Sequence, residues 1–120
     1  MRKKLLIIED DPDMSQLLKN KASELNYRCD VDSTGARWGK LIQSDRPSAI
    51  LLDMDLPKMG GFSILRQLKS KDDWRSIPVF VWSGTSDAEV VDEAKALGAE
   101  AYFFKSRGFE DLFEKIRALS

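Results

Sequence analysis

Short apolar runs alternate with amphipathic segments along the chain. Four runs lack polar alternation, which is typical of parallel strands covered on both faces, and they occupy residues 5–8, 49–52, 79–82 and 102–104. A fifth strand is expected at residues 27–31, where polar residues interrupt the apolar ones and favour a place nearer the sheet edge. After each strand, apolar residues recur every three or four positions, which predicts a helix.

Capping residues mark the ends of several predicted helices. Asp11 followed by Pro12 is typical of a helix start, with a carboxylate N-cap and proline at the first helical position. Asn26 stands where a left-handed residue would end this helix, and Asp87 is expected to cap the fourth helix. We expect the second helix to run from about Thr34 to Ser44, although two glycines weaken it.

This strict alternation predicts an α/β fold in which helices cover both faces of a parallel sheet through right-handed crossovers. The chain has 120 residues, of which 42% are hydrophobic and 32% charged, and this fits one domain over residues 1–120. The first apolar run is too short for a signal peptide core or a membrane span. A lone Cys29 cannot form an internal disulfide, which fits the cytoplasm.

Charge and composition exclude several classes of function. The net charge is −1, so no basic field marks the chain for nucleic acid or an anionic membrane. The sequence contains no histidine, which removes histidine general bases, histidine-rich metal sites and phosphohistidine carriers.

The predicted strands deliver polar side chains at their carboxyl ends, where open parallel sheets bind ligands. These residues are Glu9, Asp10 and Asp11 after the first strand, Asp53 and Asp55 at the third, Ser83 after the fourth and Lys105 after the fifth. Crowded carboxylates repel one another and coexist most readily around a hard cation, for which Mg²⁺ fits. Lys105 and Ser83 would suit an anion brought to the same place.

Each of these residues alone has a plainer interpretation. Asp11 is expected to cap a helix rather than bind a ligand, Ser83 alone would be a loop hydroxyl, and Lys105 alone a surface lysine. Trp82 and Tyr102 are core aromatic residues by default. The joint pattern, in which four strands end in the chemistry of one site, favours the site.

Four segments, LLIIEDD, ILLDMDLPKMGGFSIL, IPVFVWSG and ALGAEAYFFKS, resemble the receiver domains of two-component response regulators. The chemotaxis response regulator is a stand-alone example of that family. The resemblance covers essentially the whole chain and implies a flavodoxin-like (βα)5 fold, a doubly wound parallel sheet with strand order 2-1-3-4-5. It also implies transfer of a phosphoryl group from a phosphohistidine to an aspartate.

The resemblance assigns roles to the acidic residues. Asp53 matches the phosphoacceptor, and Glu9 and Asp10 match the acidic pair of the family. In that family the second acid, here Asp10, and the phosphoacceptor bind Mg²⁺ directly, whereas the first acid often acts through water. Asp55 lies where the family supplies a backbone carbonyl to the metal.

The other matches concern phosphoryl binding and the switch. Ser83 matches the hydroxyl residue that bonds the phosphoryl group, Gly84 the small residue beside it, and Lys105 the invariant lysine. Tyr102 matches the switch aromatic, which moves inward when the hydroxyl engages phosphate. A carboxylate is a weak nucleophile toward phosphorus, so catalysis comes from positioning and charge neutralisation. The domain would therefore catalyse its own phosphorylation and dephosphorylation, with small donors such as acetyl phosphate also working, and would not be a conventional enzyme.

The resemblance implies a sensor histidine kinase or a histidine phosphotransfer protein as the phosphodonor. An output protein or domain outside this chain would receive the signal, and dimerisation on phosphorylation is compatible with this scheme. The sequence leaves open whether the chain, which begins at Met1, is a stand-alone regulator or an excised receiver.

Three rival functions share parts of the pattern. A pseudo-receiver would dock partners without phosphorylation of its aspartate. A haloacid-dehalogenase-type phosphatase would use Asp53 and Asp55, but Pro57 departs from that motif, which should lie on the first strand of a longer chain. An FMN-binding flavodoxin would need a phosphate loop after the first strand, where Glu9 and the two following acids would repel phosphate.

One position departs from the family, because most receivers have proline after the lysine and this chain has Ser106. A cis peptide costs about 2.5–4 kcal/mol before a residue other than proline. We therefore expect a trans Lys105–Ser106 bond and a rearranged segment over residues 106–108.

Overall fold

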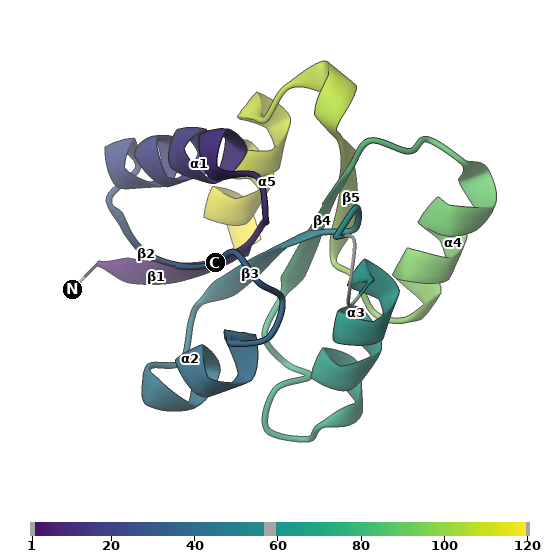
Figure 1. The fold of residues 1–120 in the computed structure, drawn as a ribbon, viewed down its shortest axis with the longest axis horizontal. Helices are drawn as coiled ribbons and strands as arrows, with labels where there is room; N and C mark the ends of the chain where they lie inside the picture. The colour runs from purple at the N-terminus through teal and green to yellow at the C-terminus, as the bar shows by residue number, and fades with distance from the viewer. Residues whose placement is uncertain (1, 57–59, 120) are drawn as a thin grey trace.

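The computed structural model describes residues 2–56 and 60–119 and shows strands and helices in strict alternation (Figure 1). The elements are β1 (Lys3–Ile8), α1 (Pro12–Glu24), β2 (Tyr27–Asp32), α2 (Trp38–Ser44), β3 (Ala49–Asp53), α3 (Gly61–Ser70), β4 (Val79–Ser83), α4 (Ala88–Ala96), β5 (Ala101–Phe104), the 3₁₀ turn η1 (Lys105–Arg107) and α5 (Glu110–Leu119). Pro57, the residue that departs from the phosphatase motif, lies outside the described residues.

The described strands form one parallel sheet in the order β2-β1-β3-β4-β5, which confirms the predicted α/β architecture and its strand order. Helices α1 and α5 cover one face, and α2, α3 and α4 cover the other (Figure 1). All strands run the same way, so their carboxyl ends meet at one edge of the sheet. Strand β2 is an edge strand of the sheet, as its polar residues predict.

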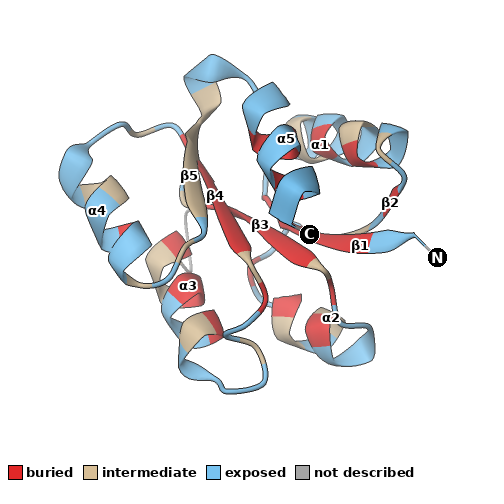
Figure 2. Ribbon diagram, turned by 180° about the vertical axis from the view of Figure 1, so that it is seen from behind, coloured by how far each residue is buried: buried red, intermediate tan, exposed pale blue. Residues whose placement is uncertain are grey.

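The core has two layers because successive side chains of a strand point to opposite faces. On β1, Leu6 and Ile8 pack toward α2 and α3, whereas Leu5 and Ile7 pack toward α1 and α5. Figure 2 shows the resulting buried stripe through the middle strands. Each such side chain stabilises the fold by about 1.5–3 kcal/mol when fully buried. The residues at the ends of the strands are therefore supported by a core that is packed on both faces of the sheet.

Three predicted helix boundaries are confirmed. The Asp11 carboxylate accepts hydrogen bonds from the backbone N–H groups of Asp13 at 2.9 Å and Met14 at 3.3 Å. Asn26 follows α1 in the left-handed region, with φ of 67°. Asp87 caps α4 by accepting from the Glu89 N–H at 2.9 Å.

The predicted second helix was wrong at its start, because α2 begins at Trp38 and not at Thr34. The buried Asp32 carboxylate accepts hydrogen bonds from the backbone N–H groups of Thr34, Gly35 and Arg37 at 2.8–3.1 Å. Gly35 has φ of 76°, which a helix does not allow. A side chain therefore holds this segment in a turn, and β2 extends one residue further than predicted, to Asp32.

The segment after β5 agrees with the prediction from Ser106. No peptide bond among the described residues is cis, so the Lys105–Ser106 bond is trans. Residues 105–107 form the turn η1, and Gly108 follows with φ of 76°.

Helix α3 begins in close contact with the chain that leaves β3. A Cβ atom on Gly61 would lie 2.5 Å from Met54 Cα and 3.2 Å from the Asp53 backbone oxygen. Only glycine allows this approach, so α3 starts directly against the segment that carries Asp53.

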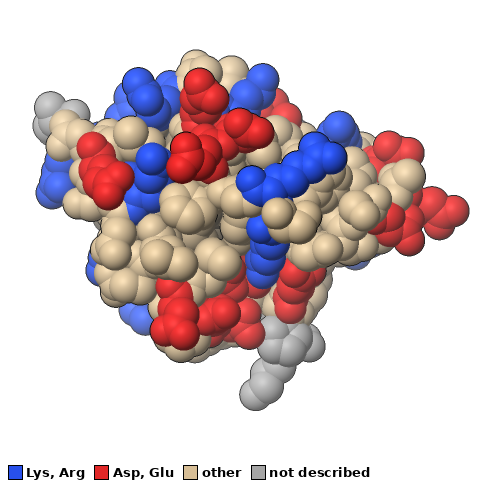
Figure 3. Space-filling model, turned by 90° about the horizontal axis from the view of Figure 1, so that it is seen from above, with Lys and Arg blue, Asp and Glu red and all other residues tan. Residues whose placement is uncertain are grey.

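The surface has no dominant sign of charge on the face in Figure 3, where acidic and basic groups alternate. None of the described helices combines the length and apolar character that a membrane crossing requires. Cys29 is a free, half-buried thiol, and burial raises its pKa to about 11.

Candidate functional site

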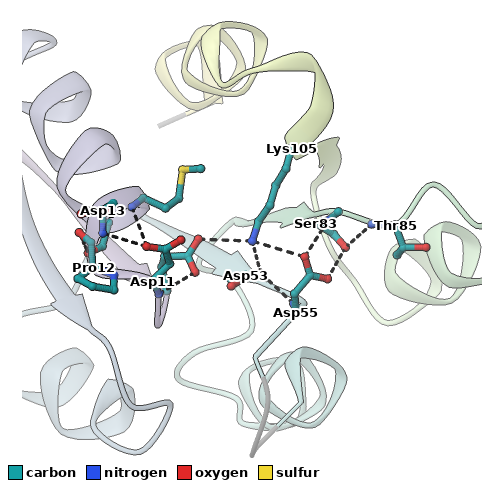
Figure 4. A network of polar contacts seen from close by, with 12 residues as sticks. Asp11, Pro12, Asp13, Asp53, Asp55, Ser83, Thr85 and Lys105 are labelled. Atoms are coloured by element: carbon teal, nitrogen blue, oxygen red, sulfur yellow. Dashed lines mark hydrogen bonds and ion pairs between the residues drawn. The ribbon is translucent and has the colours of Figure 1, made fainter.

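The site lies at the carboxyl edge of the sheet, around Asp53. This residue is the last of β3 and is only 1% exposed. Its Oδ1 atom accepts a hydrogen bond from the Asp55 N–H at 2.8 Å and lies 3.1 Å from Lys105 Nζ. Figure 4 shows Lys105 reaching from the chain after β5 toward Asp53 and Asp55. The structure therefore brings together residues that are 52 positions apart in the sequence, as the parallel topology predicts.

Glu9 is a buried acid beside Asp53. It is 1% exposed, and its Oε1 atom has no hydrogen-bond donor, although Lys105 Nζ lies 3.6 Å away. Burial and the adjacent Asp53 carboxyl group together raise the pKa of Glu9 from 4.5 to about 8, and the positive charge of Lys105 offsets only part of this rise. Without a bound cation, Glu9 thus retains a proton around neutral pH.

Asp10 completes an acidic group with Glu9 and Asp53. One carboxylate oxygen from each residue lies within 4.8 Å of the other two. Oxygen atoms at this spacing can bind a hard divalent cation. The unpaired Glu9 oxygen gives this group an acceptor that a cation would satisfy. Asp11 turns away to cap α1, in agreement with the sequence interpretation.

The Asp55 side chain makes contacts that the sequence interpretation missed, since only its backbone carbonyl was assigned a role. Its Oδ1 accepts from Ser83 Oγ at 2.9 Å, and its Oδ2 accepts from the Gly84 N–H at 2.8 Å. Lys105 Nζ lies 3.4 Å from Oδ2. Burial alone would raise the pKa of Asp55, but the bonds from Gly84 and Ser83 and the charge of Lys105 lower it overall.

Lys105 is the cation that these acids share. Burial lowers the pKa of Lys105, but its hydrogen bond to Asp53 and the charges of Asp53, Glu9 and Asp55 raise it overall. The ammonium group is therefore firmly protonated. It is a fixed positive charge directly beside the buried Asp53 oxygen.

Ser83 and Tyr102 lie on the side of the site toward α4. Ser83 is fully buried, and its Oγ also accepts from the Thr85 N–H at 3.1 Å. The half-buried Tyr102 donates its hydroxyl to the Thr85 backbone oxygen at 3.2 Å. Burial raises the pKa of Tyr102, so its phenol stays neutral. The segment at Thr85 thus connects the serine with the tyrosine.

Comparisons with known proteins bear on this arrangement. The family model described as the response regulator receiver domain matches residues 5–117. Response regulator MprA of Mycolicibacterium vanbaalenii is 29% identical over 97% of this chain, which spans about half of that relative's length, 49%. Sporulation initiation phosphotransferase F of Bacillus subtilis is 26% identical over 98% of this chain and 93% of its own length.

A solved structure of a response regulator also matches this chain. The Mn²⁺-bound form of response regulator Rcp1 is 29% identical to this chain, with a TM-score of 0.80, and the match covers 97% of this chain and 90% of that one. The family model and the solved structure therefore agree on the fold of this chain.

Proposed function

Because the chain belongs to the response regulator receiver domain family of two-component signalling, we propose that it accepts a phosphoryl group on Asp53 in a Mg²⁺-dependent reaction. The donor would be a phosphohistidine on a sensor histidine kinase or a histidine phosphotransfer protein. The phosphorylated surface would then engage an output protein or domain.

One observation carries this proposal, namely the buried Asp53 oxygen 3.1 Å from Lys105 Nζ and within the acidic group of Glu9 and Asp10. Burying a carboxylate costs free energy unless its charge is paired and hydrogen-bonded. Here one ammonium group faces three acidic side chains, Glu9, Asp53 and Asp55. Such an excess of acid suits a site that a cation completes.

Glu9, Asp10 and Asp53 would hold the magnesium ion, with the backbone carbonyl of Asp55 as a further ligand. Their hard oxygen donors fit Mg²⁺, and the unpaired buried Glu9 oxygen supports this choice. The relative Rcp1 was solved with Mn²⁺, which is consistent with a divalent cation in such a domain. When bound, the ion supplies positive charge that neutralises the phosphoryl oxygens.

The transfer itself needs few protein groups. An oxygen of Asp53 forms a new bond to phosphorus, and the bond from phosphorus to the donor breaks. The donor's imidazole nitrogen, or the acetate oxygen of acetyl phosphate, leaves with the electron pair. Lys105 stabilises one phosphoryl oxygen by its charge, and Ser83 donates its hydroxyl to another. Hydrolysis of the resulting acyl phosphate later returns free Asp53.

Ser83 also couples the site to the surface. To bond a phosphoryl oxygen, its hydroxyl must leave Asp55, and Thr85, which donates to Ser83 Oγ, must adjust. Tyr102 is bound to the Thr85 backbone oxygen and would shift with it. About two negative charges on Asp53 thereby change the surface around β5 and α4.

The test is the intact mass of the protein after incubation with acetyl phosphate and Mg²⁺. Wild-type protein should gain one phosphoryl group, and Asp53→Asn should gain none. Asp13→Asn, which neutralises an exposed acid in the first turn of α1, is the matched control and should be labelled as wild type is. Labelling that persists in Asp53→Asn would overturn the assignment, and no labelling of wild type would favour a pseudo-receiver.

A further inference from the structure

The Asp55 carboxylate binds the hydrogen-bond donors that a phosphoryl group on Asp53 would need. Its two carboxylate oxygens accept from Ser83 Oγ at 2.9 Å and the Gly84 N–H at 2.8 Å, and Lys105 Nζ lies 3.4 Å from Oδ2. These three donors come from the ends of β4 and β5 and converge on one carboxylate (Figure 4). Such a convergence of a hydroxyl, a backbone N–H and an ammonium group is a binding site for an anion.

One of these donors, Lys105, also faces Asp53. Lys105 Nζ is shared between Asp53 Oδ1, at 3.1 Å, and Asp55 Oδ2. Ser83 is fully buried, so its hydroxyl has no access to solvent and must exchange one bound partner for another. When a phosphoryl group arrives on Asp53, these donors are therefore already bound to the Asp55 carboxylate.

The Asp55 side chain is exposed enough to rotate away from these donors. Its side chain is 41% exposed, whereas that of Asp53 is 1% exposed. Rotation toward water would free Ser83 and the Gly84 N–H for another anion while Asp55 remained hydrated. The arrival of a phosphoryl group would favour this rotation because like charges repel.

We propose that Asp55 is an internal competitor of the phosphoryl group, holding Ser83, Gly84 and Lys105 in the unphosphorylated state and giving them up on phosphorylation. This inference rests on the proposed function of Asp53. It makes Asp55 a positioning residue that sets how readily the site accepts a phosphoryl group, in addition to its proposed backbone role toward the metal.

The first test is the rate of labelling by acetyl phosphate at saturating Mg²⁺, measured by intact mass. Asp55→Asn keeps the shape of the side chain and its backbone carbonyl but removes the charge. We expect it to be labelled about tenfold faster than wild type, the difference of one charge-assisted hydrogen bond. Calorimetry of Mg²⁺ binding to both proteins ensures that the comparison is made at saturation.

Asp87→Asn is the matched control. It removes one negative charge near Tyr102, and asparagine retains the ability to cap α4. Its labelling rate should stay within about twofold of wild type, because a charge outside the donor cluster is screened by water. An equal acceleration in Asp87→Asn would show a general charge effect and would overturn the competitor role.

A second readout needs neither metal nor phosphodonor. In the metal-free protein, the amide ¹H–¹⁵N signal of Gly84 should move in Asp55→Asn, because its charged acceptor is lost, and should stay in place in Asp87→Asn. An unmoved Gly84 signal in Asp55→Asn would overturn the proposed contact.

The outcomes separate this inference from the proposed function. Labelling of wild type at a rate that Asp55→Asn does not exceed overturns the competitor and leaves phosphorylation of Asp53 in place. Labelling of Asp55→Asn far above wild type supports both. If neither protein is labelled, the proposed function fails and the competitor role with it, even where the Gly84 signal confirms the contact.

Discussion

Two buried aspartates end the two strands that flank β1 in the sheet. Asp32 is the last residue of β2 and is fully buried, and Asp53 is the last residue of β3 and is 1% exposed. Asp32 accepts four hydrogen bonds, three from backbone N–H groups and one from Thr34 Oγ1 at 2.7 Å. Asp53 instead shares Lys105 with other acids.

The difference teaches that burial of a carboxylate does not itself indicate function. Around Asp32 every described contact satisfies the charge, so the residue holds a turn. Around Asp53 the acids outnumber the single ammonium group, and one oxygen of Glu9 lacks a hydrogen-bond donor. The first arrangement is complete without a ligand, whereas the second would be completed by the cation and the phosphoryl group proposed for it. Three predictions can break or sharpen this contrast.

The largest effect is expected from Asp32→Ala. It leaves the N–H groups of Gly35 and Arg37 without their acceptor, and loss of such a network costs about 3 kcal/mol of the free energy of unfolding. Urea denaturation measures this loss. Labelling of the folded variant by acetyl phosphate should persist, because Asp32 has no contact with Lys105 among those described. Loss of labelling in folded protein would mean that the two aspartates are not independent.

The course of the chain around Asp32 also marks the limit of prediction from the sequence. Strands and helices follow from burial patterns that repeat over many residues, and the edge of the sheet collects Glu9, Asp53, Ser83 and Lys105 by topology alone. Residues 34–37 were wrongly placed in a helix because their turn depends on one side chain that reaches several backbone groups. A periodic pattern contains no trace of such a contact.

The side-chain contacts of Asp55 could not be predicted from the sequence for a related reason. An acid two residues after a strand end can point to either side of the chain, and only the relative placement of β3 and β4 brings it to Ser83 and Gly84. An acid at this position, beside a strand that ends in serine, is the signal that could have suggested the pairing.

The second prediction concerns pH, where the two regions should respond in opposite directions. The pKa of Asp32 is lowered by its hydrogen bonds despite burial, so the stability it contributes is present above its ordinary pKa of 3.8 and is lost as the pH falls further. The pKa of Glu9, beside Asp53, is raised from 4.5 to about 8, so the folded state binds more protons than the unfolded state between these values. Stability from Glu9 is therefore lost as the pH rises through this window.

In metal-free protein, Glu9→Gln should remove this loss. As the pH rises from about 5 to 8, we expect the free energy of unfolding of Glu9→Gln to increase by on the order of 2 kcal/mol relative to that of wild type. Urea denaturation at several pH values in the presence of a chelator measures the difference. A constant difference across that range would show that Glu9 is ionised in the folded protein at neutral pH.

The smallest effect is expected from Asp53→Asn in metal-free protein. Neutralising Asp53 relieves its repulsion with the Asp10 carboxylate, and Lys105 keeps the Asp55 carboxylate as a partner. The free energy of unfolding should rise by about 1 kcal/mol, the opposite sign to Asp32→Ala. Asp13→Asn controls for the change in net charge, and it should leave the free energy of unfolding unchanged. A loss of stability would mean that the Asp53–Lys105 ion pair outweighs the repulsion.

The contact between Gly61 and Met54 limits which sequences this fold can accept. A methyl group at position 61 would meet the backbone that follows Asp53, so alanine there would push the segment that carries Asp53, the proposed phosphoacceptor, away from Lys105. In a library of random variants selected for signalling, position 61 should therefore be as intolerant as position 53. The reason would differ, since Asp53 would be required for the proposed phosphoryl transfer and Gly61 for the space that it leaves empty. Intolerance to substitution at this site would mark architecture as well as reactivity.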